Sequence, residues 1–159
     1  MTRRAVVLVS STRAAAGVSP DTTGPVIVDW LRAHGFDTDD ATVVADGPAV
    51  AAALGAAVES GADLIISTGG TGIGHGDGTA DATAKILRIS LPGFHEELRR
   101  RGSASTPFAL MSRGVAGVAG NSFIVNLPGS SGGVRDGLQL LGEVIEHVLD
   151  QLAGGNHDG

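Results

Sequence analysis

The sequence contains no cysteine, a single lysine and few aromatic residues, and it has no long hydrophobic run. Without cysteine, the chain forms no disulfide bond, thiolate metal site or cysteine nucleophile. Aromatic residues make up 3% of the chain and the formal net charge is -6, which disfavours a nucleic-acid partner. No apolar run approaches the ~18 residues of a membrane span. We therefore expect a soluble, cytoplasmic protein that binds neither nucleic acid nor membranes.

Apolar segments of strand length alternate along the chain with segments of helical periodicity. This alternation is typical of an α/β fold with a mostly parallel sheet covered by helices on both faces, and the turn at 119–121 adds a short antiparallel hairpin. We expect one domain over residues 1–153 and a flexible tail over 154–159. Strands are predicted at 5–9, 36–44, 64–67, 114–118 and 122–127, and helices at 24–34, 48–60, 80–89, 94–101 and 134–152.

A glycine-rich stretch follows the central predicted strand. The apolar run ends at Ser67, and six glycines lie between Gly69 and Gly78. Glycine lets the backbone approach a ligand closely and turn its N–H groups toward an anion. Because ligands of open α/β sheets bind just beyond the carboxyl ends of the strands, this stretch predicts the active site.

Common nucleotide-binding motifs do not account for this loop. A Walker A sequence needs a Gly-Lys pair, and G-x-G-x-x-G fails because His75 or Asp77 stands at its last position. What remains is an anion cradle that ends in the carboxylate of Asp77. A carboxylate beside a phosphate implies a bridging Mg²⁺, although Asp77 or Thr79 could instead cap the next helix. The spacing of Asp46 is more typical of a helix cap, but Asp46 also follows a strand and could face the same crevice.

A second glycine-rich turn, Gly129 to Gly133, fits the G-x-S-x-G pattern of a serine hydrolase. In such an enzyme the acid and the histidine follow the serine in the chain, at the ends of further strands. Here only a predicted helix, with His147, and the tail, with His157, follow, so a catalytic triad is not expected. The turn is better explained as a second anion-binding site at a helix N-terminus, with Ser130 and Ser131 as donors.

Three other polar features are more typical of structure than of chemistry. His95 does not begin the zinc motif H-E-x-x-H, because Arg99 stands at the second histidine position. The run Arg99 to Arg101 predicts a solvated helix C-terminus. His75 and Asp77 could share a metal ion, but a loop histidine is more often simply exposed.

Five motifs then recur in an order typical of one family. Together they resemble the molybdopterin-binding domain of the MogA/MoaB type, also found in gephyrin, over about residues 4–152. The motifs are Thr68-Gly69-Gly70-Thr71-Gly72, Asp77-x-Thr79, Pro92-Gly93-Phe94, Ser112-Arg113 and Leu127-Pro128-Gly129-Ser130.

The resemblance implies a single three-layer α/β/α domain, commonly a homotrimer with a hexamer as the alternative, in molybdenum cofactor biosynthesis. The implied reaction is adenylyl transfer from Mg-ATP to molybdopterin, which gives adenylylated molybdopterin and pyrophosphate. A molybdate-insertion enzyme is the implied downstream partner.

The resemblance also implies roles for individual residues. Asp77 corresponds to the essential acid after the loop and is the expected Mg²⁺ ligand. Asp46 corresponds to the second acid of the site, which makes it a catalytic residue rather than a cap. The expected substrate-binding residues are Ser11, Thr68, Gly69, Gly70, Thr71, Gly72, Thr79, Pro128, Gly129 and Ser130.

The chain departs from the family pattern at four positions, one of which is Thr12, where the family's Ser-Asp-Arg has an aspartate. Gly76 stands where an arginine usually precedes the loop acid, and Ala80 and Ser131 each replace a proline. The missing arginine removes a bidentate phosphate contact. The alternative prediction is therefore a non-catalytic homologue that binds or carries molybdopterin.

Overall fold

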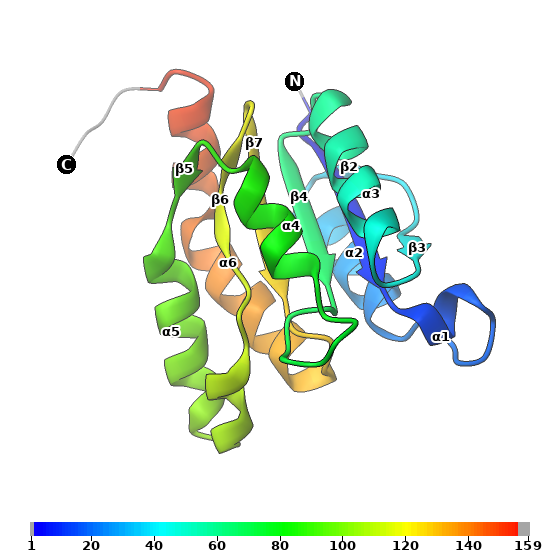
Figure 1. The fold of residues 1–159 in the computed structure, drawn as a ribbon. Coiled ribbons are helices and arrows are strands. Elements are labelled where there is room, and N and C mark those ends of the chain that lie inside the picture. Colours follow the sequence, from blue (N-terminus) through cyan, green and yellow to red (C-terminus); the bar gives the residue numbers. More distant parts are fainter. Residues whose placement is uncertain (1, 156–159) are drawn as a thin grey trace.

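Seven short strands form one mixed sheet in the computed structural model, which describes residues 2–155 (Figure 1). The strands are β1 (Arg4–Ser10), β2 (Asp37–Thr38), β3 (Thr42–Val44), β4 (Leu64–Thr68), β5 (Ile89–Ser90), β6 (Ala116–Ala119) and β7 (Ser122–Leu127). Their order across the sheet is β2-β1-β4-β7-β6-β5, and β3 also pairs with β1. β6 pairs antiparallel with β5 and with β7, and the other pairings among these strands are parallel.

Helices cover both faces of the sheet. They are α1 (Thr12–Ala15), α2 (Thr23–Ala33), α3 (Pro48–Glu59), α4 (Thr79–Ile86), α5 (Pro92–Ser103), the 3₁₀ helix η1 (Pro107–Met111) and α6 (Ser131–Leu152). α3 and α4 lie on one face, and α2, α5 and α6 lie on the other (Figure 1). Side-chain alternation builds the two faces: Leu64 and Ile66 join the core under α2 and α6, and Ile65 joins the core under α3.

The three central parallel strands end level with one another. Val9 of β1 pairs with Thr68 of β4, and Thr68 pairs with Leu127 of β7. The segments that follow these strands therefore leave the sheet at one edge, which we call the carboxyl edge. The predicted ligand-binding segments are thus brought together in space.

The predicted α/β class and the short antiparallel hairpin are confirmed. Gly120 has a φ of +56° in the turn between β6 and β7. Gly35, with a φ of +84°, follows α2 as expected of a glycine that ends a helix.

The single strand predicted at 36–44 is wrong. The segment 39–41 leaves the sheet, so β2 pairs with the start of β1 and β3 pairs with its end. The middle of β1 therefore has no strand on its outer side. A cavity occupies this gap.

Several predicted helix boundaries are also wrong. The helix placed at 80–89 ends at Ile86, because Leu87 is extended and leads into β5. Pro92 lies in the first turn of α5 instead of preceding the helix. α6 begins at Ser131, three residues before its predicted start, and α1 lies in a segment predicted to be loop.

The predicted flexible tail, 154–159, lies mostly outside the described residues, which end at Gly155. Gly154 follows α6 with a φ of +87°, and Gly155 N donates a hydrogen bond to Asp150 O at 2.8 Å. Across residues 2–155, no helix combines the length and the apolar character needed to cross a membrane.

Candidate functional site at the carboxyl edge

The loop that begins at Thr68 is wedged between the end of β1 and the start of α4. Gly69 and Gly70 have φ values of +88° and +69°, which favour glycine. A Cβ on Gly69 would collide with the carbonyl oxygen of Ser10, and a Cβ on Gly70 would collide with Thr79 Oγ1. Both glycines are therefore required by the available space as well as by backbone conformation.

The loop also contacts the turn that follows β7. Thr68 Oγ1 donates a hydrogen bond to Pro128 O at 2.7 Å, and Gly69 N donates to Leu127 O at 3.1 Å. A Cβ on Gly129 would lie 3.4 Å from Cα of Gly69. The two glycine-rich turns predicted to bind ligand thus meet backbone to backbone.

Arg113 holds the second half of the loop. Its Nε donates to Gly72 O at 2.9 Å, and its two terminal nitrogens bond Asp77 O at 2.8 Å and the Asp81 carboxylate at 3.1 Å. Its backbone N–H donates to Thr71 O at 2.8 Å. Arg113 belongs to one of the five motifs, but no sequence pattern predicts this role.

Asp77 is half-buried within the loop. Its Oδ2 accepts a hydrogen bond from Gly74 N at 2.9 Å, and its Oδ1 accepts none from residues 2–155. The N-cap residue of α4 is Gly78, without a side-chain bond, so the alternative that Asp77 or Thr79 caps this helix is wrong. The Asp77 carboxylate turns back into the loop instead.

Asp46 lies just beyond β3 and bonds the end of β1. Its Oδ1 accepts from Ser10 Oγ, and its Oδ2 accepts from Thr12 Oγ1 at 3.1 Å. The helix-cap interpretation is wrong, because Gly47, with a φ of +106°, is the N-cap residue of α3 and turns the chain away from Asp46. The carboxylate therefore belongs to the carboxyl edge. Ser10 is a site residue that the sequence prediction missed in favour of its neighbour Ser11.

The predicted serines Ser11 and Ser130 are both helix N-caps. Ser11 Oγ accepts from Ala14 N at 3.2 Å, and Ser130 Oγ accepts from Gly133 N at 3.1 Å. Since each hydroxyl uses only an acceptor position in its cap, its hydrogen is available to a ligand. The exposed Ser131, by contrast, makes no hydrogen bond through its side chain to any residue of 2–155.

The two acids lie beside the same loop segment, 72–76. Cβ atoms on Gly72 and Gly74 would lie 2.8 Å and 3.0 Å from Asp77 Oδ2, and a Cβ on Gly76 would lie 3.7 Å from Asp46 Cβ. Gly74 N bonds the Asp77 carboxylate, and Asp46 borders the same segment at Gly76. The pair comes from segments 31 positions apart in the sequence.

This donor set suits a Mg²⁺ ion that arrives with phosphate ligands. Such ions are usually held by one or two carboxylates together with substrate oxygens and water, and the free Oδ1 of Asp77 meets that need. The described part of the chain offers no cluster of three or more metal-ligating His, Asp or Glu side chains, so a closed protein cage is absent there. His75 is exposed, as a loop histidine usually is.

Thr79 supplies a buried hydroxyl beside the loop. The residue is 0% exposed, and its Oγ1 has no hydrogen-bond partner among residues 2–155. An unsatisfied buried hydroxyl costs on the order of 1–3 kcal/mol. A ligand oxygen or a water molecule at the loop would remove that cost.

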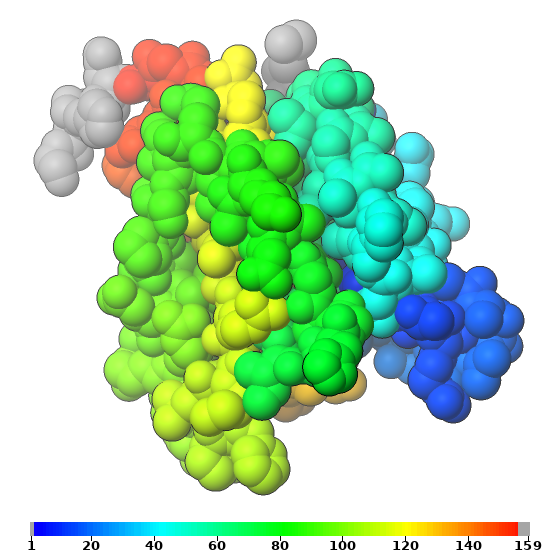
Figure 2. Space-filling view, in the orientation of Figure 1, coloured from blue at the N-terminus to red at the C-terminus, as the bar shows by residue number. Residues whose placement is uncertain are grey.

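Two cavities adjoin the contact between Gly69 and Gly129. The smaller, of about 200 Å³, is lined by the end of β1, the start of α2 and the loop. The larger, of about 540 Å³, lies between α5, η1 and the start of α6, and Thr71, Pro128, Gly129 and Ser130 contribute to its wall. The glycine loop, in green, and η1, in yellow-green, lie at the same end of the molecule (Figure 2).

His95 lines the larger cavity and is only 3% exposed. Its Nε2 lies 2.7 Å from Asn126 O, and its Nδ1 has no partner among the described residues. Burial lowers the pKa of His95 to about 4; the bond to Asn126 opposes this shift, and the charge of Arg99 adds to it. The imidazole is therefore neutral at pH 7.

The three arginines at the end of α5 have different environments. Arg99 is half-buried and lines the larger cavity, so the prediction of a wholly solvated cluster is wrong at this position. Arg101 bridges to Glu143 of α6 at 2.6 Å. Hydrogen bonds from Arg100 and Arg101 lower the pKa of Glu97 to about 2.

The serine hydrolase alternative has no geometric support. Ser131 is exposed in the first turn of α6, and His147 lies more than four turns further along the same helix. His157 is outside the described residues.

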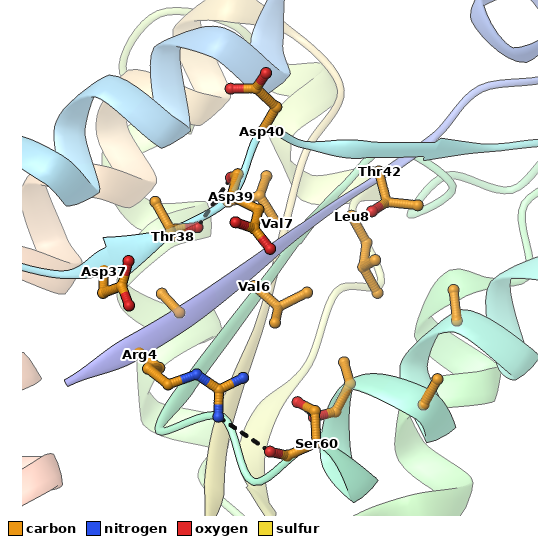
Figure 3. Close-up of a pocket in the computed structure, with 14 residues that line it drawn as sticks. Arg4, Val6, Val7, Leu8, Asp37, Thr38, Asp39, Asp40, Thr42 and Ser60 are labelled. Atoms are coloured by element: carbon orange, nitrogen blue, oxygen red, sulfur yellow. Dashed lines mark hydrogen bonds between the residues drawn. The ribbon is translucent and has the colours of Figure 1, made fainter.

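A third cavity, of about 360 Å³, lies along the outer edge of β1 (Figure 3). We call it the β1-edge cavity. It occupies the gap between β2 and β3 and is lined by Arg4, Asp37, Asp39 and Asp40, among others. None of the predicted site residues lines it.

A glycine-rich loop at the carboxyl edge of a mostly parallel sheet is the place where α/β proteins of this class bind their ligands. Comparison with known families specifies the class further. Residues 5–147 match the family described as "Probable molybdopterin binding domain", so the chain belongs to this molybdopterin-binding family, and the predicted resemblance is confirmed.

Relatives of this chain carry related names. It is 40% identical over 154 residues to a molybdenum cofactor biosynthesis bifunctional protein of Synechococcus elongatus, covering 96% of this chain and 48% of that protein. It is 33% identical over 152 residues to a molybdopterin adenylyltransferase of Helicobacter pylori, covering 93% and 86%. The solved Mog protein from Mycobacterium ulcerans is 50% identical, with a TM-score of 0.92 and coverage of 95% and 99%. The chain spans about half the length of the bifunctional relatives it matches.

Proposed function

We propose that this chain acts in molybdenum cofactor biosynthesis and transfers an adenylyl group from ATP to molybdopterin. The observation that carries the proposal is the placement of Asp46 and Asp77 beside one glycine-rich loop at the carboxyl edge. A relative that covers most of the chain is named for this activity.

The reaction needs an oxygen of the molybdopterin phosphate to attack the α-phosphorus of ATP. A phosphorus–oxygen bond forms there while the bond to the bridging oxygen of the β-phosphate breaks, and pyrophosphate leaves. The chain contributes by positioning and by charge stabilisation, which dominate catalysis of such transfers. Backbone N–H groups of the loop and the free hydroxyl of Thr79 would donate to the phosphate oxygens.

Two carboxylates would complete this site. Asp77 would hold Mg²⁺ through its free oxygen, and the bound ion would neutralise charge on the phosphates. Asp46 would orient the attacking phosphate or assist in holding the ion. Ser10 and Thr12 fix the Asp46 carboxylate through hydrogen bonds, so it is already oriented before substrate binds.

A non-catalytic, molybdopterin-carrying role is the second candidate, and Gly76 is the observation that favours it. The position before the loop acid lacks a guanidinium, and Arg113 does not replace it because its donors are used within the loop and on Asp81. The names of the relatives favour the catalytic proposal over this one.

Incubation with molybdopterin and Mg-ATP tests the proposal, with adenylylated product and pyrophosphate as readouts. We expect Asp77→Asn to lower turnover more than about 100-fold, because the substitution removes a charge at the reacting phosphates. Ser131→Ala is the matched control and should stay within about twofold. Tight molybdopterin binding without product would favour the carrier role, and neither binding nor product would overturn both.

We further propose a cytoplasmic homotrimer that passes its product to a molybdate-insertion enzyme, with a hexamer as the alternative assembly. The family resemblance supports this, and so do the exposed apolar side chains Phe108, Leu110 and Met111 of η1, which suit burial against another subunit. Analytical ultracentrifugation distinguishes monomer, trimer and hexamer.

A further inference from the structure

A series of buried hydrogen bonds connects the centre of the sheet to the glycine loop. Asn126 of β7 is 0% exposed, and its Nδ2 lies 2.8 Å from Ser67 Oγ of β4 and 3.0 Å from Thr83 Oγ1 of α4. Thr83 Oγ1 in turn lies 2.8 Å from Thr79 O. The backbone N–H of Thr79 donates to Gly70 O at 3.1 Å, which brings the series to the loop.

Chemistry fixes the direction of each of these bonds. The backbone N–H of Val115 lies 3.1 Å from Asn126 Oδ1 and can only donate, so the other atom of that amide is the nitrogen. Thr83 Oγ1 therefore accepts from Asn126 Nδ2 and donates its own hydrogen to Thr79 O, which can only accept. Both hydrogens of the Asn126 amide and the hydroxyl hydrogen of Thr83 are thus used, and the reversed arrangement is excluded.

The helix that carries Thr83 has few other means of keeping its position. α4 has eight residues, its N-cap residue, Gly78, makes no side-chain bond, and a helix of this length depends on tertiary packing. Its buried side chains, those of Thr79, Ala80 and Thr83, include no large apolar group. Among residues 2–155, the bond between Asn126 and Thr83 is the only side-chain hydrogen bond that joins α4 to a strand.

Thr79 connects the position of α4 to the loop and to Asp46. A Cβ on Gly70 would collide with Thr79 Oγ1 and would lie 3.1 Å from Ser10 Oγ, so the Cα of Gly70 packs against both side chains. Ser10 Oγ is also the donor to the Asp46 carboxylate. Because protein interiors are close-packed, a shift of Thr79 would move the loop relative to that carboxylate.

Helix stability alone does not explain the hydroxyl of Thr83. A side-chain bond to the carbonyl four residues earlier slightly destabilises a helix and often bends it. A buried polar network in which every member is satisfied fixes one arrangement of the groups that it joins. Here those groups are two central strands, α4 and, through Thr79, the glycine loop.

We propose that Thr83 is a positioning residue, whose hydroxyl joins Thr79 to the Asn126 amide and thereby holds the glycine loop in the geometry needed for adenylyl transfer. This inference rests on the proposed function and adds a residue that acts through another. It predicts a loss of turnover with little loss of substrate affinity, because a small misplacement of the loop matters most at the reacting phosphates.

Two substitutions separate the hydroxyl of Thr83 from its packing. Thr83→Val keeps the branched shape and removes the hydroxyl, whereas Thr83→Ser keeps the hydroxyl and removes a methyl group. We expect Thr83→Val to lower kcat about 10- to 100-fold with KM for ATP and for molybdopterin within about threefold, and Thr83→Ser to keep kcat within about threefold. A larger loss of kcat in the serine variant than in the valine variant would show that Thr83 only packs, and would overturn the inference.

Ser122→Ala is the matched control for the loss of a buried hydroxyl. Ser122 is 1% exposed and its Oγ donates to Ala62 O at 2.6 Å, at the opposite end of β7 from Asn126. Its removal should lower Tm, as removal of the Thr83 hydroxyl does, but should leave kcat within about twofold. Equal losses of kcat in Ser122→Ala and Thr83→Val would show that turnover follows stability, which contradicts a positioning role.

Hydrogen exchange at the Thr79 amide tests the positioning without any substrate. In the wild type this amide should exchange as slowly as that of Asn126, since the same series of hydrogen bonds holds both. In Thr83→Val it should exchange at least about 10-fold faster, and in Ser122→Ala it should not change.

The wild type alone can also contradict the inference. A Thr79 amide that exchanges as fast as those of the exposed residues 73–76 would refute it, even if Thr83→Val does not fold. If exchange behaves as expected and the wild type makes no product, the adenylyl transfer fails while the placement of the loop by Thr83 stands.

Discussion

The carboxyl edge and the β1-edge cavity are both lined by polar groups, and they differ in how those groups are held. In the β1-edge cavity, Asp37, Asp39 and Asp40 are exposed, and the guanidinium of Arg4 makes one hydrogen bond to residues 2–155, 3.1 Å to Ser60 O (Figure 3). At the carboxyl edge, glycines with positive φ, a multiply bonded arginine and three buried atoms without a partner among residues 2–155 lie around the loop; these atoms are Thr79 Oγ1, His95 Nδ1 and Ser112 Oγ. The volume of a cavity and the charges on its wall therefore do not by themselves identify a functional site. Polar groups held in fixed positions identify it better.

The largest expected effect on stability concerns the glycines at the two places. Gly70→Ala should lower the free energy of unfolding by roughly 2–5 kcal/mol, because the φ of +69° disfavours alanine and the added Cβ meets Thr79. Gly61→Ala, next to the β1-edge cavity, has a φ of +77° but free space, and should cost roughly 1–2 kcal/mol. Urea denaturation measures both. Equal losses would show that the loop is not tightly packed.

A second contrast is the pH dependence contributed by His95. Its folded pKa of about 4 lies below the ordinary histidine value of 6.5, so its contribution to stability is complete above pH 6.5 and is lost as the pH falls toward 4. The wild type should lose up to about 3 kcal/mol over this range that His95→Gln does not lose. Chemical denaturation at pH 7 and at pH 4.5 measures the difference.

The sequence patterns locate the carboxyl edge but not the contacts within it. The apolar strand before Gly69 and the density of glycines identify the loop, because both follow from local backbone preferences. Asp46 is ambiguous from its spacing, since a carboxylate before a proline-initiated helix usually caps it. The folded structure excludes the cap, because Gly47 has a positive φ and Asp46 accepts a hydrogen bond from Ser10 at the end of β1.

Contacts between distant segments explain what the sequence does not reveal. Arg113 binds a loop some 40 positions earlier in the chain, and His95 pairs with a carbonyl 31 positions later. Neither contact has a local signature, because each joins segments that meet only in the folded chain. The break between β2 and β3 is likewise set by pairing with β1 rather than by a turn motif.

The third contrast compares the two arginines. Arg113→Lys should lower kcat/KM about 10-fold, because an ammonium cannot reproduce the three separate side-chain contacts of the guanidinium. Arg4→Lys, in the β1-edge cavity, should stay within about twofold. Hydrogen exchange should become faster over residues 72–77 in the first variant only. If exchange there is unchanged, Arg113 does not hold the loop.

The smallest effect on the free energy of unfolding is expected at Gly76. Substitutions there can also distinguish the catalytic role from the carrier role. Its φ lies outside the left-handed region, and a Cβ there would make ordinary contacts of 3.7 Å and 3.9 Å with Asp46. Gly76→Ala and Gly76→Arg should therefore change the free energy of unfolding by no more than about 0.5 kcal/mol.

The arginine variant restores the guanidinium that the family usually places before the loop acid. A charge-assisted contact to phosphate should raise kcat/KM for ATP about 10-fold over the alanine variant. If the wild type binds molybdopterin without turnover and Gly76→Arg makes product, the chain is a carrier that lost its activity at this position. The alternative outcome is that the wild type makes product already, with kcat/KM for ATP unchanged in Gly76→Arg. In that case the loop glycines, Thr79 and the two carboxylates suffice to hold the phosphates. These groups alone then distinguish the carboxyl edge from the β1-edge cavity.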